Sequence, residues 1–282
     1  MIDKDILEKI FKQITEGNAE KLSTGFNDLD AVLSGVEKGN LIVIGGRPAM
    51  GKTAFMTSIL YNFLKHDKKC LLFSLEMSIS RYLKRLIAQV GEIELFSLND
   101  NEFLNDRKKE DIKTALDIIS SFDLSIFDDT YKLDEICKKI ETEKPEYVFI
   151  DSLQLLDAPR KKQRSEAITN IMLDLKKIAK ENNCIIFISS QLSRALESRC
   201  DKRPILSDLR ESGDIENLSD VVMFIYREEY YKTYFDDKDY ALNKGEAEII
   251  IAKNKMGAVC SIKLLFRSPI AKFLEPIHYD VF

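Results

Sequence analysis

The hydrophobic pattern divides the 282-residue chain into an N-terminal amphipathic segment and a longer region in which short apolar runs alternate with helical segments. Near the start, apolar side chains recur every three or four positions, the spacing of one helix face. These residues are Ile6, Leu7, Ile10, Phe11 and Ile14. A polar stretch from Thr15 to Ser23 then reads as a short linker. We predict a linker helix over residues 1–20 and one domain over 21–282. The stripe fits a helix folded back on its own domain and equally an arm that packs on a neighbouring subunit.

Five short apolar runs predict the central strands. They are Leu41–Ile44, Cys70–Leu75, Tyr147–Ile150, Cys184–Ser189 and Val221–Tyr226. The runs are continuously apolar, as expected for parallel strands buried on both faces. Between them, Thr53–His66 and Ser165–Asn182 read as helices, so the alternation predicts an α/β fold with a mostly parallel sheet and helices on both faces. Near the end, Glu248–Ala252 and Ser261–Phe266 flank Asn254–Gly257 and predict an antiparallel hairpin.

Composition narrows the function classes. Apolar residues make up 45% of the chain and charged residues 32%, which is ordinary globular usage and argues against long disorder. No apolar run approaches the roughly 18 residues that span a bilayer, and no secretory leader opens the chain, so we expect a cytoplasmic protein without a membrane partner.

Five cysteines without a C-x-x-C pair favour a reducing compartment. The net charge of −5 argues against a protein that coats nucleic acid, although it allows a local cationic channel. Neither of the two histidines has a partner at metal-ligand spacing, which argues against histidine-centred catalysis.

The strongest local motif follows the first predicted strand and opens the next helix. It fits G-x-x-x-x-G-K-[ST] with Gly46, Arg47, Pro48, Ala49, Met50, Gly51, Lys52 and Thr53. Glycines let the backbone wrap a phosphate, so that its N–H groups and the helix N-terminus face the anion. We expect Lys52 to contact the β- and γ-phosphates and Thr53 to offer its hydroxyl to Mg²⁺. Since strand and helix both flank the motif, a plain glycine turn is the weaker interpretation.

Three polar residues follow predicted strands and should meet the motif at one edge of the sheet. Asp151 ends the run Tyr147–Ile150 and is a second candidate for the metal shell. Glu76 follows the second strand, where a carboxylate can accept the proton of an attacking water. Gln191 follows the fourth strand and is placed to sense a terminal phosphate. Each residue, taken alone, also fits a polar residue that starts a loop.

Several longer segments resemble the DnaB-type bacterial replicative helicases. The resemblance runs from about Thr24 to Glu275 and rests on these segments: Gly45–Thr53 (GGRPAMGKT), Phe73–Ser78 (FSLEMS), Asp151–Leu155 (DSLQL), Ser190–Arg194 (SQLSR) and Lys202–Ile215 (KRPILSDLRESGDI). Thr24–Asp30 and Val221–Arg227 match the same pattern.

That resemblance implies a RecA-like P-loop NTPase core and an ATP-dependent DNA helicase. It further implies a hexameric ring that hydrolyses ATP between subunits and translocates on single-stranded DNA, with a helicase loader or a primase as further partners. Glu76 then becomes the water-activating carboxylate, Asp151 the metal-shell acid and Gln191 the phosphate sensor. The leading helix becomes an arm that docks on the adjacent subunit.

The resemblance also implies where DNA and the nucleotide base bind. The family's DNA-contacting loop matches Arg210, Glu211 and Gly213, which would hold the phosphate backbone without reading bases. The cluster Arg160, Lys161, Lys162 and Arg164 is a weaker candidate for a cationic channel, because such charge runs are usually solvated. Arg227 is a weak candidate for binding the nucleotide base.

The chain departs from the family in two respects. It begins at the linker helix, so we expect the family's separate N-terminal domain to be absent, either from an excised domain or from a naturally short form. The family's trans-acting A-K-x-R-x-G segment reads Ala252–Gly257 here, in which Lys253 matches but Lys255 replaces the arginine finger. Lysine keeps the charge and loses the planar fork, so we expect slower hydrolysis with little change in nucleotide binding.

Three interpretations of function remain open at this stage. The first is an ATP-driven ring helicase with Glu76, Lys52, Gln191, Lys253 and Lys255 as its catalytic residues. The second is a RecA-like ATPase without unwinding activity. The third is a non-enzymatic paralogue that binds nucleotide and regulates another helicase ring.

Overall fold

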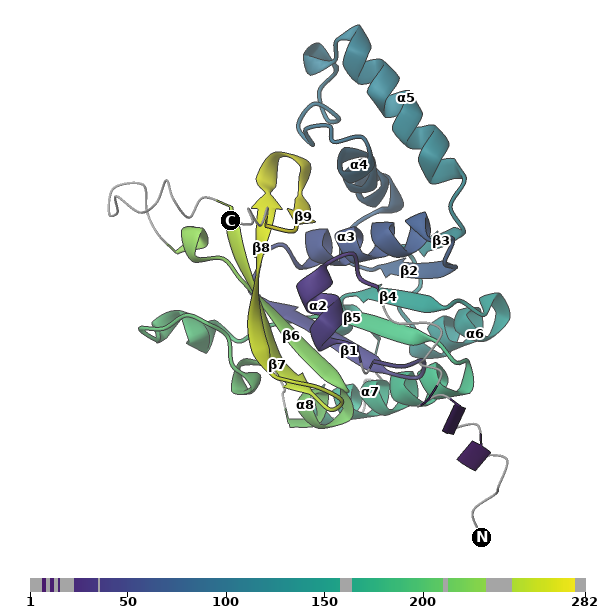
Figure 1. The fold of residues 1–282 in the computed structure, drawn as a ribbon, viewed down its shortest axis with the longest axis vertical. Coiled ribbons are helices and arrows are strands. Elements are labelled where there is room, and N and C mark those ends of the chain that lie inside the picture. Colours follow the sequence, from purple (N-terminus) through teal and green to yellow (C-terminus); the bar gives the residue numbers. More distant parts are fainter. Residues whose placement is uncertain are drawn as a thin grey trace.

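A single twisted sheet organises the part of the chain that the computed structural model describes, residues 7–8, 11–12, 15, 23–34, 36–157, 164–209, 213–231 and 245–276 (Figure 1). The strands within these residues are β1 Leu41–Gly46, β2 Cys70–Ser74, β3 Leu124–Phe127, β4 Tyr147–Asp151, β5 Ile185–Gln191, β6 Val221–Tyr226, β7 Glu246–Asn254, β8 Cys260–Arg267 and β9 Lys272–Leu274. The helices are α2 Asn27–Val32, α3 Lys52–Lys65, α4 Ile79–Val90, α5 Asp106–Ser120, α6 Leu133–Glu143, α7 Arg164–Glu181 and α8 Gly213–Leu218.

The strand order brings the ends of distant segments together. The sheet runs β3-β2-β4-β5-β1-β6-β7-β8-β9, with β1 to β6 parallel and the last three strands antiparallel. Gly46 lies opposite Gln191, and Ser74 lies opposite Asp151. The carboxyl ends of β1, β2, β4 and β5 therefore share one edge, which is where ligands bind in open α/β sheets.

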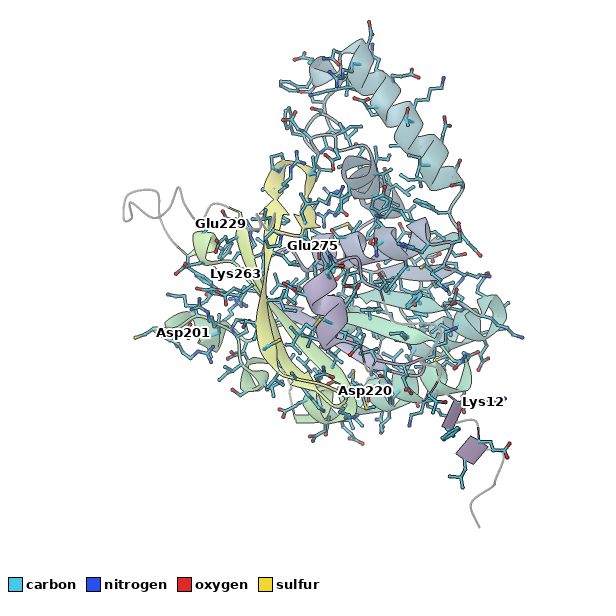
Figure 2. All side chains as sticks on the ribbon, in the orientation of Figure 1. Lys12, Asp201, Asp220, Glu229, Lys263 and Glu275 are labelled. Carbon is cyan, nitrogen blue, oxygen red and sulfur yellow. The ribbon has the colours of Figure 1, made fainter. Side chains whose placement is uncertain are left out.

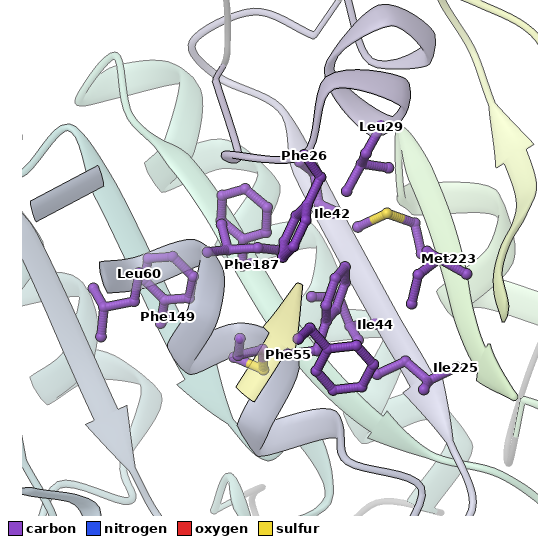
Figure 3. Close-up of a cluster of buried hydrophobic side chains, with 14 of the residues drawn as sticks. Phe26, Leu29, Ile42, Ile44, Phe55, Leu60, Phe149, Phe187, Met223 and Ile225 are labelled. Carbon is purple, nitrogen blue, oxygen red and sulfur yellow. The ribbon is translucent and has the colours of Figure 1, made fainter. Parts of the chain in front are cut away.

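Helices cover both faces of the sheet because alternate strand residues point to opposite sides. On one face, Ile42 and Ile44 belong to a buried cluster that includes Phe55 and Leu60 of α3 (Figure 3). On the other face, Val43 belongs to a second buried cluster that includes residues of α6, α7 and α8. Helices α4 and α5 lie beyond the α3 layer, and α5 is the element farthest from the sheet in Figure 1.

The predicted strands, helices and hairpin are confirmed, with corrected boundaries. Strand β1 continues to Gly46 because its last two residues pair with β5. The sequence predicts a fourth strand that begins at Cys184, yet the Cys184 N–H donates to Ala179 O of α7 (3.1 Å), so that residue ends the helix turn and β5 starts one residue later. The predicted hairpin is β7–β8, and both strands extend beyond the predicted limits. The described residues contain no helix long and apolar enough to cross a membrane.

Only parts of the predicted linker helix fall within the described residues. Leu7, Glu8, Phe11, Lys12 and Thr15 are helical, and the Thr15 hydroxyl donates to Phe11 O (2.9 Å). The Leu7 and Phe11 side chains are 52% and 66% exposed in the single chain. Two members of the predicted stripe therefore lie on the surface, while Ile6, Ile10 and Ile14 lie outside the described residues.

A candidate nucleotide site at the ends of the parallel strands

The loop after β1 has the conformation of a phosphate cradle. Gly51 lies in the left-handed region (φ +100°), and a Cβ there would approach the Phe273 ring to 3.1 Å, so a larger residue would strain the turn into α3. The side chain of Met50 is buried, whereas Pro48 and Ala49 are exposed at the tip. The loop thus anchors one side chain in the core and leads directly into the N-terminus of α3, a position where backbone N–H groups can bind an anion.

Lys52 lies buried at the start of α3, inside this loop. Its ammonium donates to the carbonyl oxygens of Gly46 (2.9 Å) and Arg47 (3.4 Å). Desolvation lowers the pKa of Lys52, while the carboxylates of Glu76 and Asp151 partly offset that effect. A buried cation held only by neutral carbonyls gains from an anionic partner, so a polyphosphate fits this loop.

The predicted metal residues are brought together. The Thr53 hydroxyl donates to Asp151 Oδ2 (2.6 Å), and the Ser189 hydroxyl donates to Asp151 Oδ1. Burial raises the pKa of Asp151, against the effect of these two hydrogen bonds. A hard cation prefers such oxygen donors, so Thr53 and Asp151 fit a Mg²⁺ that is bound together with a nucleotide.

Glu76 and Gln191 also meet at this edge. The Gln191 amide donates to Glu76 Oε1 (3.2 Å), and the Ser152 hydroxyl donates to the same oxygen (2.9 Å). Glu76 is exposed, so its carboxylate is accessible to solvent. The Gln191 backbone N–H donates to Gln154 Oε1 (3.1 Å), which fixes the end of β5. The arrangement joins the candidate base directly to the candidate sensor.

Two arginines flank the cradle. The Arg47 guanidinium donates to Leu192 O (2.9 Å) and pairs with Glu197 (2.7 Å), which ties the cradle to the segment after β5. Arg227 follows β6, donates to Ala49 O (3.3 Å) and lies 4.1 Å from the Phe266 ring centroid. Arg227 thus lies at the rim of the cradle, and its contact with a nucleotide base stays a prediction.

The structure separates Lys253 and Lys255 from these residues. Both lie at the end of β7, and Lys255 donates to Asp220 (3.2 Å), just before β6. Asp220 lies beside Leu41, at the opposite end of β1 from the cradle. Five residue steps of about 3.3 Å place that end roughly 16 Å away, beyond the reach of a lysine side chain.

Of the three predicted DNA-contacting residues, one lies within the described part of the chain. Gly213 is exposed and begins α8, while Arg210 and Glu211 lie outside the described residues. The same holds for Arg160, Lys161, Lys162 and the side chain of Arg164. The preceding segment is anchored, because Leu209 forms an isolated bridge with Leu192, next to Gln191.

Sequence reasoning missed three residues that shape these sites. Ser189 and Ser152 orient the carboxylates of Asp151 and Glu76. Asp220 accepts a hydrogen bond from the Leu41 N–H (2.8 Å) as well as from lysine ammonium groups. The serines carry no motif of their own. An acid directly before an apolar strand was a visible signal for Asp220.

Comparison with known proteins agrees with this geometry. The family model described as "DnaB-like helicase C terminal domain" matches residues 21–275. The chain is 33% identical over 311 aligned positions to "Replicative DNA helicase DnaB" of Helicobacter pylori, covering 96% of this chain and 64% of the relative. It is 35% identical to "Replicative DNA helicase DnaC" of Bacillus subtilis, covering 96% of this chain and 61% of the relative. The chain therefore spans less than two thirds of these relatives.

Solved structures give the same result. A structure described as an ATPase domain superposes with a TM-score of 0.89 at 34% identity, covering 97% of this chain and 98% of the other. "The Structure Of A DnaB-Like Replicative Helicase And Its Interactions With Primase" superposes with a TM-score of 0.87 at 33% identity, covering 98% and 67% of the two chains. The RecA-like fold predicted from the sequence is confirmed.

Proposed function

We propose that this chain, which belongs to the family of DnaB-like helicase C-terminal domains, is the ATP-driven motor of a cytoplasmic helicase. The motor translocates on single-stranded DNA and unwinds duplex DNA. The observation that carries the proposal is the sheet edge where the cradle around Lys52, the Thr53–Asp151 pair and the Glu76–Gln191 pair meet. Relatives that are named replicative DNA helicases support the same activity.

The chemistry at this edge follows from the hydrogen bonds of each group. Lys52 exchanges its carbonyl partners for phosphate oxygens when ATP binds, since a charged acceptor makes the stronger hydrogen bond. Mg²⁺ held near Thr53 and Asp151 would neutralise phosphate charge. Both hydrogen bonds to Glu76 use Oε1, which leaves Oε2 to take a proton from the attacking water.

Hydrolysis also needs groups from a second subunit under this proposal. Lys253 and Lys255 lie at the wrong end of β1 for this chain's own cradle, so they serve a neighbour's γ-phosphate. The exposed Leu7 and Phe11 support the interpretation of the leading segment as an arm on the adjacent subunit. We propose on this basis that the chain assembles in a ring, which the family resemblance makes hexameric, with a helicase loader or a primase as further partners. The solved relative described with primase supports the latter.

The segment around the start of α8 is the proposed contact to DNA. Arg210, Glu211 and Gly213 would hold the phosphate backbone, which positions the strand without reading its sequence. Gln191 and this segment are joined through the bridge between Leu192 and Leu209. A change at the γ-phosphate therefore has a short covalent and hydrogen-bonded route to the DNA contact.

Turnover per chain, measured across protein concentrations with and without a single-stranded oligonucleotide, tests the proposal. The rate per chain should rise with protein concentration, because catalytic lysines come from a second subunit. It should rise again with DNA. A rate that is independent of both would support a RecA-like ATPase without unwinding activity. A chain that does not hydrolyse ATP but slows a complete helicase in a mixture would support the regulatory interpretation, which Lys255 favours.

A further inference from the structure

The acid before β6 joins three parts of the molecule. Asp220 accepts hydrogen bonds from the Leu41 N–H (2.8 Å), from Lys176 of α7 and from Lys255 (3.2 Å). Backbone hydrogen bonds add to these contacts, since the Asp220 N–H donates to Leu41 O (2.9 Å) and the Lys255 N–H donates to Asp220 O (3.0 Å). The Asp220 side chain is only 9% exposed. Burial alone would raise the pKa of Asp220, but the hydrogen bonds from Lys176 and Leu41 outweigh it and lower the pKa.

This acid fixes one side of Lys255 and leaves the other side accessible. The Lys255 side chain is 43% exposed although its ammonium contacts the buried carboxylate. An ammonium has three donors, and among the described residues one side-chain hydrogen bond, to Asp220 Oδ1, uses them. Lys255 is therefore held in place and keeps donors for an outside anion.

A β-bulge sets the direction of the neighbouring lysine. Val222 lies opposite Lys253 and Met223 lies opposite Ile251, so Ala252 has no partner on β6. Such bulges redirect the side chains around them. The Lys253 ammonium contacts the carbonyl oxygens of Glu216 and Asn217, in the last turn of α8.

Lys253 is thus attached to the last turn of α8, and Lys255 is attached to the residue two positions beyond that helix. Helix α8 starts at Gly213, and its last turn is contacted by Lys253. Two residues later the chain reaches Asp220, which holds Lys255. In Figure 2, Asp220 lies near α8 at the end of the sheet away from Glu229, which follows the cradle end of β6.

We propose that Asp220, two residues beyond the end of α8, is a positioning residue that holds Lys255 in place for ATP hydrolysis on a neighbouring subunit. The inference rests on the proposed function. The neighbouring site thereby receives a pre-positioned cation.

The test is a double-mutant cycle with Asp220→Asn and Lys255→Gln, read as DNA-stimulated steady-state ATP hydrolysis. Asp220→Asn alone should lower kcat by about tenfold to a hundredfold, the scale expected for a misplaced group, and leave KM for ATP unchanged. In the Lys255→Gln background, the same change should have no further effect, because Asp220 acts through Lys255. An equal loss in both backgrounds, or no loss, would overturn the inference.

Controls separate this role from stability. Lys176→Met removes the other cation from the same carboxylate but leaves the contact to Lys255, so kcat should be kept. A loss of kcat equal to that of Asp220→Asn would assign Asp220 a structural role only. If Asp220→Asn does not assemble, Asp220→Glu takes its place in the cycle, because it keeps the charge and moves the acceptor by one methylene. A wild type that DNA does not stimulate would count against the proposed function itself.

Discussion

Glu76→Gln is expected to lower DNA-stimulated ATP turnover by about 10²–10⁴-fold and to leave nucleotide binding nearly unchanged. A glutamine Oε1 can still accept the hydrogen bonds that Ser152 and Gln191 donate, so the geometry is preserved. It cannot take a proton from the attacking water. The ATP turnover rate should therefore fall, while the affinity for a fluorescent ATP analogue stays close to that of the wild type.

The control for this substitution is Glu246→Gln. It makes the same chemical change in a solvent-exposed ion pair with Lys263 of β8, and turnover should not change. If Glu76→Gln hydrolysed ATP at the wild-type rate, another group would have to activate water and the assignment of the base would be wrong.

Lys255→Arg is expected to raise DNA-stimulated kcat by about tenfold or more, which corresponds to about 1.4 kcal/mol of transition-state stabilisation. An arginine finger contributes roughly 10³–10⁵ in other phosphoryl-transfer enzymes, through a planar fork that grips several phosphate oxygens. The lysine supplies only a point charge. Asp220 is an acceptor that suits the guanidinium too, so the new side chain should be held in the same place.

Lys263→Arg, an exposed lysine on β8, is the matched control and should leave kcat unchanged. KM for ATP should stay constant in both variants, because the finger acts on the transition state. An unchanged kcat in Lys255→Arg would mean that Lys255 makes no contact with the transferred phosphate.

The hydrophobic pattern was sufficient to predict the position of the buried strands, and it predicted the surrounding helices and edge strands less well. Strand β6 was predicted within its observed limits because Val221–Tyr226 is buried on both sides. Helix α5 exposes most of its residues, and α6 fully buries only Ile136 and Ile140, so neither helix was recognised from its apolar residues. Strand β3 is only half-buried at the sheet edge, and β9 has three residues, too few for a periodic signal.

The candidate site was predictable where a residue follows a strand. Lys52, Asp151, Glu76 and Gln191 converge because parallel strands end at one edge. The distant position of Lys255 was not readable from its spacing, since it depends on an antiparallel strand that returns to the opposite edge. The place of Asp220 before an apolar strand was visible in the sequence, but its partners were not, because they come from β1, α7 and the end of β7.

Strand displacement on a forked duplex with a 5′ single-stranded tail tests the central claim most directly. The account predicts ATP-dependent release of the displaced strand by the wild type. It predicts none by Lys52→Ala, because the γ-phosphate loses its charge partner. An intact fork in the presence of ATP and wild-type protein that binds the tail would contradict the claim that this chain is a helicase motor.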